Sequence, residues 1–394
     1  MRKQAVQLVR TKAGRPAWGR ILLLVLAVLL LLFLLLWLLA PGLASPARLV
    51  RFFRYMGLRD KEGYGVISYD GGAGAVYADL EGSLLVGTEN GLTLYAMDGE
   101  QKALIQGSLP TPVLRTGGGR SLCFSPGSSY AAAVDSSGAV LLDEAFDGAF
   151  VDANVSFDGC IAYLSTENGY KTVATVLNRE QKPIYRYYSR TRYLNACAVS
   201  EDGALLAVAS LEEQDSLFRS GVTFFRTDEE MADRETEQGS SVSQDLGSGL
   251  IYELCFLDGD DLLAVCQNQL VFLRTDGSRL YKMPLNDESL LDYSVSEDGW
   301  VILALRTDAG GDRVLTLDAE GELLGELKPE GRVRSVSAAE SCAAVLTERS
   351  VGTYDRRLHA RDSSPDTAGA TRALARSDGT VLLICAGTTK LLIP

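Results

Sequence analysis

The chain has 394 residues, of which 46% are apolar, so it can form a sizeable core in one large repeat domain or in several smaller domains. Its formal net charge is −13, although residues 1–20 contribute six Lys or Arg and no acid, which leaves −19 for the remainder. An acidic body argues against nucleic acid as a partner, because nucleic acid is bound by a basic stripe.

The first predicted element is a transmembrane helix over residues 21–40, which are twenty apolar residues without a charge. At ~1.5 Å per residue this helix is ~30 Å long, the thickness of a bilayer core. The alternative is a signal peptide cleaved near Ala44, but the apolar region of signal peptides has only about 7–15 residues. We therefore expect a single-pass anchor from Ile21 to Ala40, with the lipid bilayer as its partner.

Residues 1–20 form a basic tail, which predicts that the N-terminus is cytoplasmic and that the long body is extracytoplasmic. Residues 41–62 are expected to be a juxtamembrane stalk. Within them, 47-ARLVRFFRYMGLRDK-61 is either an amphipathic helix on lipid headgroups or a stalk helix with solvated arginines.

Residues 63–394 contain a repeated unit, a strand followed by a tight turn and a second, apolar strand, as in 196-ACAVSEDGALLAVAS-210. The spacings between successive turns are 45, 32, 44, 56, 40, 41 and 39 residues. This period, with short strands and punctuating glycines, is typical of a β-propeller with four antiparallel strands per blade. The eight predicted turn positions are Gly82, Gly127, Gly159, Gly203, Gly259, Gly299, Glu340 and Gly379.

The fold class is therefore all-β, with eight blades favoured, although the 32-residue spacing leaves seven blades open. The last unit ends after a third strand, and we expect 64-YGVISYD-70 to supply the fourth strand and close the ring. The 56-residue spacing contains the acidic stretch 227–249, which is either a regulatory loop or a solvated excursion.

With this anchor and these repeats, most suggestively in 184-IYRYYSRTRYLNACAVSEDGALLAVASL-211, the chain resembles WD-like and quinoprotein-like propellers. More specifically, residues 15–394 are similar to a family of uncharacterised single-pass membrane proteins of Gram-positive bacteria, catalogued as a domain of unknown function. The resemblance implies an extracytoplasmic propeller without an established activity. The Trp-Asp dipeptide of true WD repeats is absent, so their shared hydrogen-bonded tetrad is not expected.

We predict no catalytic, cofactor-binding or metal-binding residues. The single histidine, His359, lies in a polar stretch without a G-x-S-x-G motif, and a histidine-based zinc site needs more ligands. The seven cysteines form no C-x-x-C pair and are interpreted as core residues, with one inter-blade disulfide as the alternative. The glycine clusters at 70–82 and 115–120 lack a following G-K-[ST] and are interpreted as turns.

A possible partner-binding rim combines the segment 185-YRYYSRTRY-193 with the turn 212-EEQDSLFRSG-221. The first contains a connection from an outer strand to the next inner strand, 189-SRTR-192, and the second is a loop between the second and third strands of a blade. In propellers these two kinds of connection lie on the same face. Arginine beside aromatic rings is typical of binding hot spots. Acidic neighbours could instead neutralise the arginines, and the tyrosines could belong to an outer strand that covers the next blade. The predicted rim residues are Tyr187, Tyr188, Arg190, Arg192, Tyr193, Phe218 and Arg219.

The resulting hypothesis is a non-enzymatic binding or scaffolding module of the cell envelope, with an unknown protein or glycan partner. The alternative is a lyase or hydrolase that acts on envelope polysaccharide through the central channel. Such an enzyme is expected to have carboxylate, Arg or Tyr side chains with perturbed pKa values in the channel. A bare or apolar channel is expected of a scaffold.

Overall fold

The computed structural model describes Tyr55 and residues 65–72, 74–214, 217–228, 241–259, 261–286, 288–340, 342–367 and 369–393. The predicted tail and anchor, residues 1–40, lie outside this part, as does the stalk apart from Tyr55. Among the described residues, no helix is both long and apolar enough to cross a membrane. Residues 61–394 form one compact unit, which is described below.

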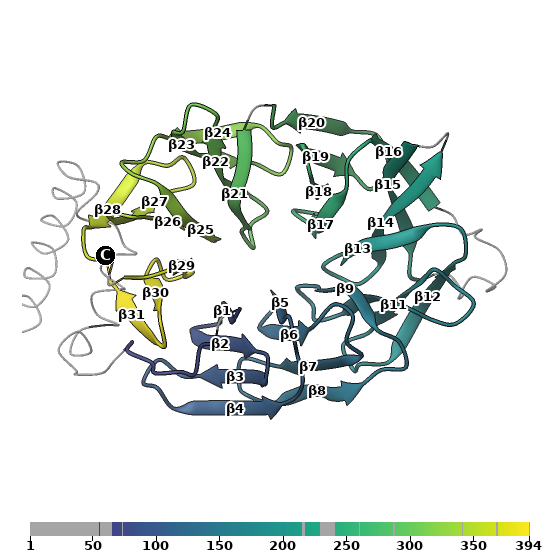
Figure 1. The fold of residues 1–394 in the computed structure, drawn as a ribbon, viewed down its shortest axis with the longest axis horizontal. Helices are drawn as coiled ribbons and strands as arrows, with labels where there is room; N and C mark the ends of the chain where they lie inside the picture. The colour runs from purple at the N-terminus through teal and green to yellow at the C-terminus, as the bar shows by residue number, and fades with distance from the viewer. Residues whose placement is uncertain are drawn as a thin grey trace, which may run out of the picture. The chain divides into compact units, whose positions relative to one another are not determined.

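This unit consists of eight antiparallel sheets, seven of four strands and one of three, so the predicted propeller has eight blades (Figure 1). Blades 1 to 4 contain β1 (Val76–Leu80), β2 (Ser83–Thr88), β3 (Gly91–Tyr95), β4 (Gln101–Gln106), β5 (Val113–Gly117), β6 (Arg120–Phe124), β7 (Tyr130–Val134), β8 (Val140–Ala145), β9 (Phe150–Val155), β10 (Ile161–Ser165), β11 (Thr172–Leu177), β12 (Pro183–Ser189), β13 (Tyr193–Val199), β14 (Leu205–Gln214), β15 (Leu217–Arg226) and β16 (Ser241–Gly247). Blades 5 to 8 contain β17 (Ile251–Phe256), β18 (Asp261–Cys266), β19 (Gln269–Arg274), β20 (Leu280–Pro284), β21 (Glu288–Val295), β22 (Val301–Thr307), β23 (Asp312–Leu317), β24 (Leu323–Leu327), β25 (Val333–Ala339), β26 (Cys342–Thr347), β27 (Val351–Tyr354), β28 (Ala360–Ser364), β29 (Arg372–Ala375), β30 (Val381–Cys385) and β31 (Thr388–Leu392). The first strand of each blade lies nearest the centre of the ring in Figure 1.

The second strand of each blade is sandwiched between neighbouring blades, which explains its continuous apolar sequence. In β2, five of the six residues are buried, and in β22 the first five are buried. Apolar clusters cross from blade to blade, and one of them joins Leu84 and Val86 of β2 to Leu382 and Ile384 of β30. The core is therefore a ring of layers between blades rather than one central mass.

Polar side chains also connect the innermost strands of successive blades. Asp152 Oδ2 accepts a hydrogen bond from the backbone N–H of Cys197 at 3.0 Å, and Asp292 Oδ2 accepts one from Val336 at 2.9 Å. Ser335 Oγ accepts the equivalent bond from Ala373, also at 2.9 Å. These bonds satisfy backbone donors that face the channel, where no further strand is available.

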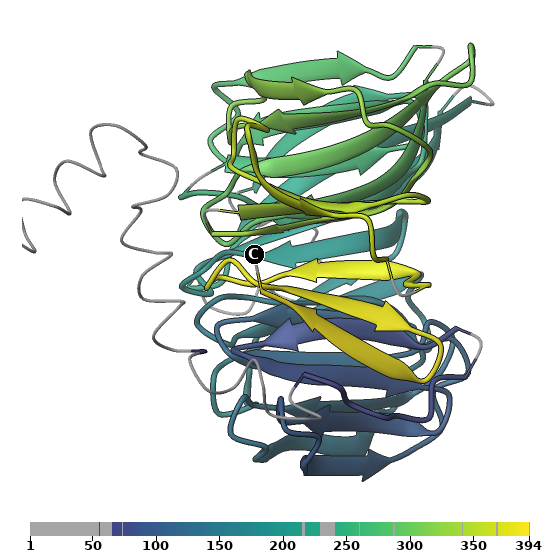
Figure 2. The ribbon, with the colours of Figure 1, turned by 90° about the vertical axis from the view of Figure 1, so that its left-hand side faces the viewer.

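The prediction that the N-terminal strand closes the ring is confirmed. Ser68 pairs with Thr388 in an antiparallel bridge, and backbone hydrogen bonds join Tyr69 N to Gly387 O and Thr389 N to Ile67 O. Figure 2 shows the yellow last blade beside the blue-purple first blade. The N-terminal segment thus pairs with β31, the outer strand of the three-stranded last blade, and joins the two ends of the propeller.

Two sequence predictions are wrong in detail. The turn at Gly127 joins β6 to β7, whereas the first turn of blade 2 lies at Gly118 and Gly119. All three glycines have positive φ, so either turn fits the pattern used to align the repeats. The stretch 227–249 is also not all loop, because β16 forms the outer strand of blade 4; its exposed polar residues reflect that edge position.

Candidate functional site

The central channel contains a cluster of charged and phenolic side chains that come from four blades. Arg115 on β5 directs Nη1 to Glu253 Oε1 at 3.3 Å and Nη2 to Asp152 Oδ1 at 3.8 Å. Glu253 also accepts hydrogen bonds from the Tyr293 hydroxyl and, at 3.7 Å, from Cys255 Sγ. Blades 2, 3, 5 and 6 are thus linked around one guanidinium group.

Glu253 departs from a repeated structural position. It follows a β-bulge on its inner strand, as Asp292 and Ser335 do on theirs. Those two side chains bond the backbone of the next blade, whereas Glu253 bonds the Tyr293 side chain and pairs with Arg115. Its place in the channel is therefore not explained by the hydrogen bonds to backbone N–H groups of the next blade that account for Asp292 and Ser335.

Burial perturbs the titration of this cluster. Burial raises the pKa of Asp152 to about 6, although the Arg115 charge acts in the opposite direction. Burial, followed by the charge of Glu253, raises the pKa of the Tyr293 phenol. Burial alone would lower the pKa of Arg115, but Glu253 and Asp152 outweigh it, so the pKa of the guanidinium is raised. The channel therefore contains the kind of cluster expected of the enzyme alternative.

A cavity of about 690 Å³ opens beside this cluster. Three of its wall residues, Arg115, Glu253 and Tyr293, belong to the cluster. The turns after the inner strands contribute further residues, namely Phe157, Glu201, Glu297, Asp298 and Glu340. The volume lies within the roughly 300–1,000 Å³ that is usual for small-molecule sites.

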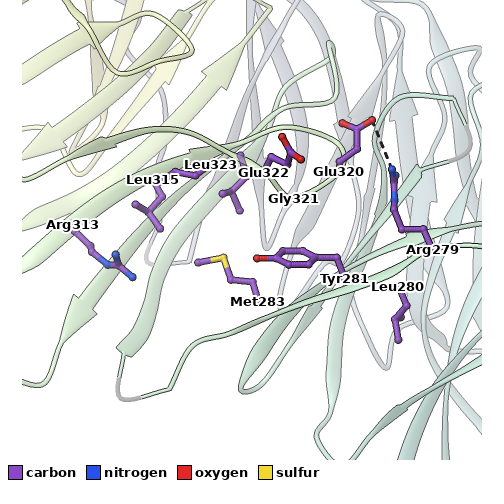
Figure 3. A pocket seen from close by; sticks show the side chains of 11 residues that line it. Arg279, Leu280, Tyr281, Met283, Arg313, Leu315, Glu320, Gly321, Glu322 and Leu323 are labelled. Carbon is purple, nitrogen blue, oxygen red and sulfur yellow. Dashed lines mark ion pairs between the residues drawn. The ribbon is translucent and has the colours of Figure 1, made fainter.

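A second cavity, of about 720 Å³, lies between β20 of blade 5 and the outer strands β23 and β24 of blade 6 (Figure 3). Its two arginines already pair with protein carboxylates: Arg279 with Asp261 and Glu320, and Arg313 with Glu288. The remaining wall is largely apolar side chains such as Met283 and Leu315. We regard this outer cavity as a poorer candidate for chemistry than the channel.

The structure brings the two predicted rim connections together. Arg192 Nε lies 3.3 Å from Glu212 Oε1, and Arg192 Nη2 donates to the Tyr187 hydroxyl at 2.9 Å. Arg219 pairs with Asp245 at 3.0 Å, and Arg190 lies over the Tyr170 ring at 5.2 Å. The carboxylates at Glu212 and Asp245 thus neutralise two of the three arginines within the protein.

The aromatic residues of the predicted rim fall into two groups. Tyr193 and Phe218 are 57% and 64% exposed. Tyr187 and Tyr188 are 4% and 7% exposed, so their assignment to a binding surface is wrong. They belong to the outer strand β12, where the Tyr187 ring packs 4.4 Å from the ring of Phe225 in the next blade.

The cysteines, His359 and the glycine cluster at 115–120 have structural positions in the propeller. None of the seven cysteines, all of which the structure describes, forms a disulfide, and five of them are buried. His359 is an exposed turn residue whose Nδ1 lies 3.1 Å from Asp355 Oδ2. The glycine cluster at 115–120 contains the turn between β5 and β6, as expected.

Sequence reasoning missed the channel cluster. Aligning the inner strands on their turns places Asp152, Glu253, Asp292, Ser335 and Arg372 near the same point of the repeat. That recurring polar residue, before an otherwise apolar stretch, was the sequence signal that polar side chains line the channel. The cross-channel meeting of Arg115 and Glu253 is not readable from the repeat.

Fold and channel together define an eight-bladed β-propeller with a polar channel. A model of a family of unknown function (DUF5711) matches residues 59–361, and the chain belongs to this family. No curated protein matches the chain.

Solved propellers are similar in fold. The C-terminal WD40 domain of Sif2 has a TM-score of 0.53 at 14% identity, covering 83% of this chain and 99% of that one. A eukaryotic initiation factor structure has a TM-score of 0.50 at 10% identity, covering 78% of this chain and 80% of that one. BamB from Moraxella catarrhalis has a TM-score of 0.48 at 14% identity, covering 83% and 95%. At such identities the likeness concerns the fold alone.

Proposed function

We propose that this protein is a membrane-anchored, extracytoplasmic binding module that holds a protein partner at the cell envelope without catalysing a reaction. The observation that carries the proposal is the pair of exposed rings, Tyr193 and Phe218, on neighbouring blade connections. Lys171 Nζ lies 4.3 Å from the centroid of the Tyr193 ring, which adds a cation beside an exposed aromatic surface. Tyr and Phe side chains are enriched at protein interfaces relative to the rest of the protein surface.

The anchoring part of the proposal is supported by the twenty apolar residues at 21–40 and by the acid-free basic tail that precedes them. Protease added to intact protoplasts should degrade the propeller. Protection of the propeller until the cells are lysed would refute the orientation.

The rim is tested by photo-crosslinking in intact envelopes, with Phe218→Ala and Tyr193→Ala compared with the wild type. Each change should reduce the partner yield tenfold or more, about 1.4 kcal/mol, because it removes a ring that the bound partner would bury. The matched control is Leu323→Ala, since Leu323 is 58% exposed on blade 6, away from the rim. Equal crosslinking in wild type and both rim variants would end the rim proposal.

A second candidate function, a hydrolase or lyase acting on envelope polysaccharide, is favoured by the channel cluster. Asp152 has a raised pKa suited to a general acid, and Glu253 accepts a hydrogen bond from Tyr293. Release of reducing ends from purified cell-wall polysaccharide, abolished by Glu253→Gln, would support this function. Equal release by wild type and variant, or none by either, would exclude it for that substrate.

A further inference from the structure

Phe157 presents an aromatic ring to the channel cavity although it lies at the turn after an inner strand. Its side chain is 50% exposed and lines the cavity. The turn already lies against the backbone of Gly118 in blade 2. The approach is so close that a Cβ at position 118 would be only 1.5 Å from the Phe157 carbonyl oxygen. Close contact between the two backbones therefore fixes the position of the turn that carries the ring.

Carboxylates with no ion-pair partner among the described residues share this cavity with the ring. The backbone of Glu201 lies next to the turn that carries Phe157, because the N–H of Asp158 donates to the Glu201 carbonyl at 3.2 Å, and Glu201 lines the same cavity. Glu297 and Glu340 line the cavity from blades 6 and 7. Burial, and then the charge of Glu340, raises the pKa of Glu297. The protein thus places three carboxylates from blades 4, 6 and 7, none of them in an ion pair among the described residues, in the wall of one cavity.

The basic groups in the cavity wall do not offset this charge. Arg115 is already paired with Glu253 and Asp152. Of the five acidic wall residues, Glu253 pairs with Arg115 and Asp298 pairs with Arg356. Arg372, the other basic wall residue, therefore faces three further carboxylates, those of Glu201, Glu297 and Glu340. Within the described residues, no cluster of three or more His, Cys, Asp or Glu has metal-binding geometry, so an organic cation fits the observations better than a metal ion.

We propose that the channel cavity binds an organic polyamine, with one ammonium group over the Phe157 ring beside Glu201 and another between Glu297 and Glu340. A cation over an aromatic face is stabilised by the ring quadrupole, and partial desolvation strengthens that attraction. The two carboxylate groups come from blades 3–4 and blades 6–7, so an extended ligand with separated charges suits them better than a compact monovalent cation. This site is independent of the rim and of the partner proposed above.

The test is calorimetric titration of the purified full chain with spermidine, alongside choline as a compact cation and glucuronate as an anion. Saturable spermidine binding at one site is expected, with choline at least tenfold weaker and glucuronate silent. Phe157→Ala and Glu297→Gln should each weaken spermidine binding tenfold or more. Affinity should also fall as pH is lowered through the raised pKa of Glu297, because protonation removes its charge.

Matched controls separate this site from general attraction to an acidic protein. Phe218→Ala removes an exposed ring outside the cavity, and Glu144→Gln removes an exposed carboxylate on β8; both should leave spermidine affinity unchanged. The proposal is overturned by an absence of saturable spermidine binding, by preferred binding of glucuronate, or by unchanged affinity in folded Phe157→Ala. Equal losses in the controls and the cavity variants would overturn it as well.

Discussion

Replacing Thr389 by valine should weaken the closure of the ring without changing the shape of the side chain. The Thr389 hydroxyl accepts a hydrogen bond from Ile67 N–H at 2.9 Å and donates one to Gly65 C=O at 2.9 Å. Valine can do neither, and both backbone groups would remain in a buried site. Each unsatisfied group costs about 1–3 kcal/mol, and the added methyl recovers at most about 1 kcal/mol. The two groups together cost about 2–6 kcal/mol, so the expected net loss is about 1–5 kcal/mol.

Urea unfolding of the full chain, followed by circular dichroism, measures this loss, and amide exchange at Ile67 locates it. Thr388→Val is the control, because Thr388 is the neighbouring residue and is exposed. This control should change the free energy of unfolding by no more than about 0.5 kcal/mol. Equal unfolding midpoints for the two variants, with unaltered exchange at Ile67, would refute the role assigned to the closing strand.

Two further predictions concern the channel. Gly118→Ala should lower the free energy of unfolding by at least about 2 kcal/mol, because Gly118 has φ of 52° and no room for a Cβ. Gly127→Ala should lower it less, because Gly127 has φ of 82° but nothing within 4 Å of the added Cβ. Thermal unfolding measures both, and a larger loss for Gly127→Ala would contradict the packing argument. The raised pKa of Asp152, about 6 against an ordinary 3.8, means that its contribution to stability is full below pH 3.8 and lost as pH rises through 6. Asp152→Asn should therefore gain on the order of 1–3 kcal/mol relative to the wild type between pH 4 and pH 7 in urea titrations, and a pH-independent difference would show that Asp152 is not the titrating group.

The blade architecture could be predicted because local chemistry repeats in every blade. An Asp-Gly or similar turn needs positive φ, and the strand that follows is buried on both sides, so both leave a sequence signal. The same reasoning failed in blade 2, where Gly127 serves a second turn with the same conformation as the first. The closing strand was predictable because the last blade lacked a partner for its outer edge.

The candidate site could not be predicted in the same way. Arg115 and Glu253 come from blades that are not adjacent, and no periodicity relates them. Tyr187 and Tyr188 looked like surface residues in a run of arginines and tyrosines, but both are buried. The Tyr187 ring packs on Phe225 of the next blade, and the Tyr188 ring packs on Tyr170 of its own blade. Burial by a neighbouring blade depends on the three-dimensional packing, which a single strand does not reveal.

The shared last blade has a consequence for the synthesis of the protein. Ile67 leaves the ribosome long before Thr389, the residue 322 positions later that it must bond. Every intermediate blade can fold in order, but the ring stays open until Thr388 and Thr389 emerge. Closing such a long loop is a slow step, because its entropy cost comes before the contacts form. A chain that stalls or is truncated before Thr388 exposes one edge of β30 and one free strand, and such unpaired edges promote association between chains.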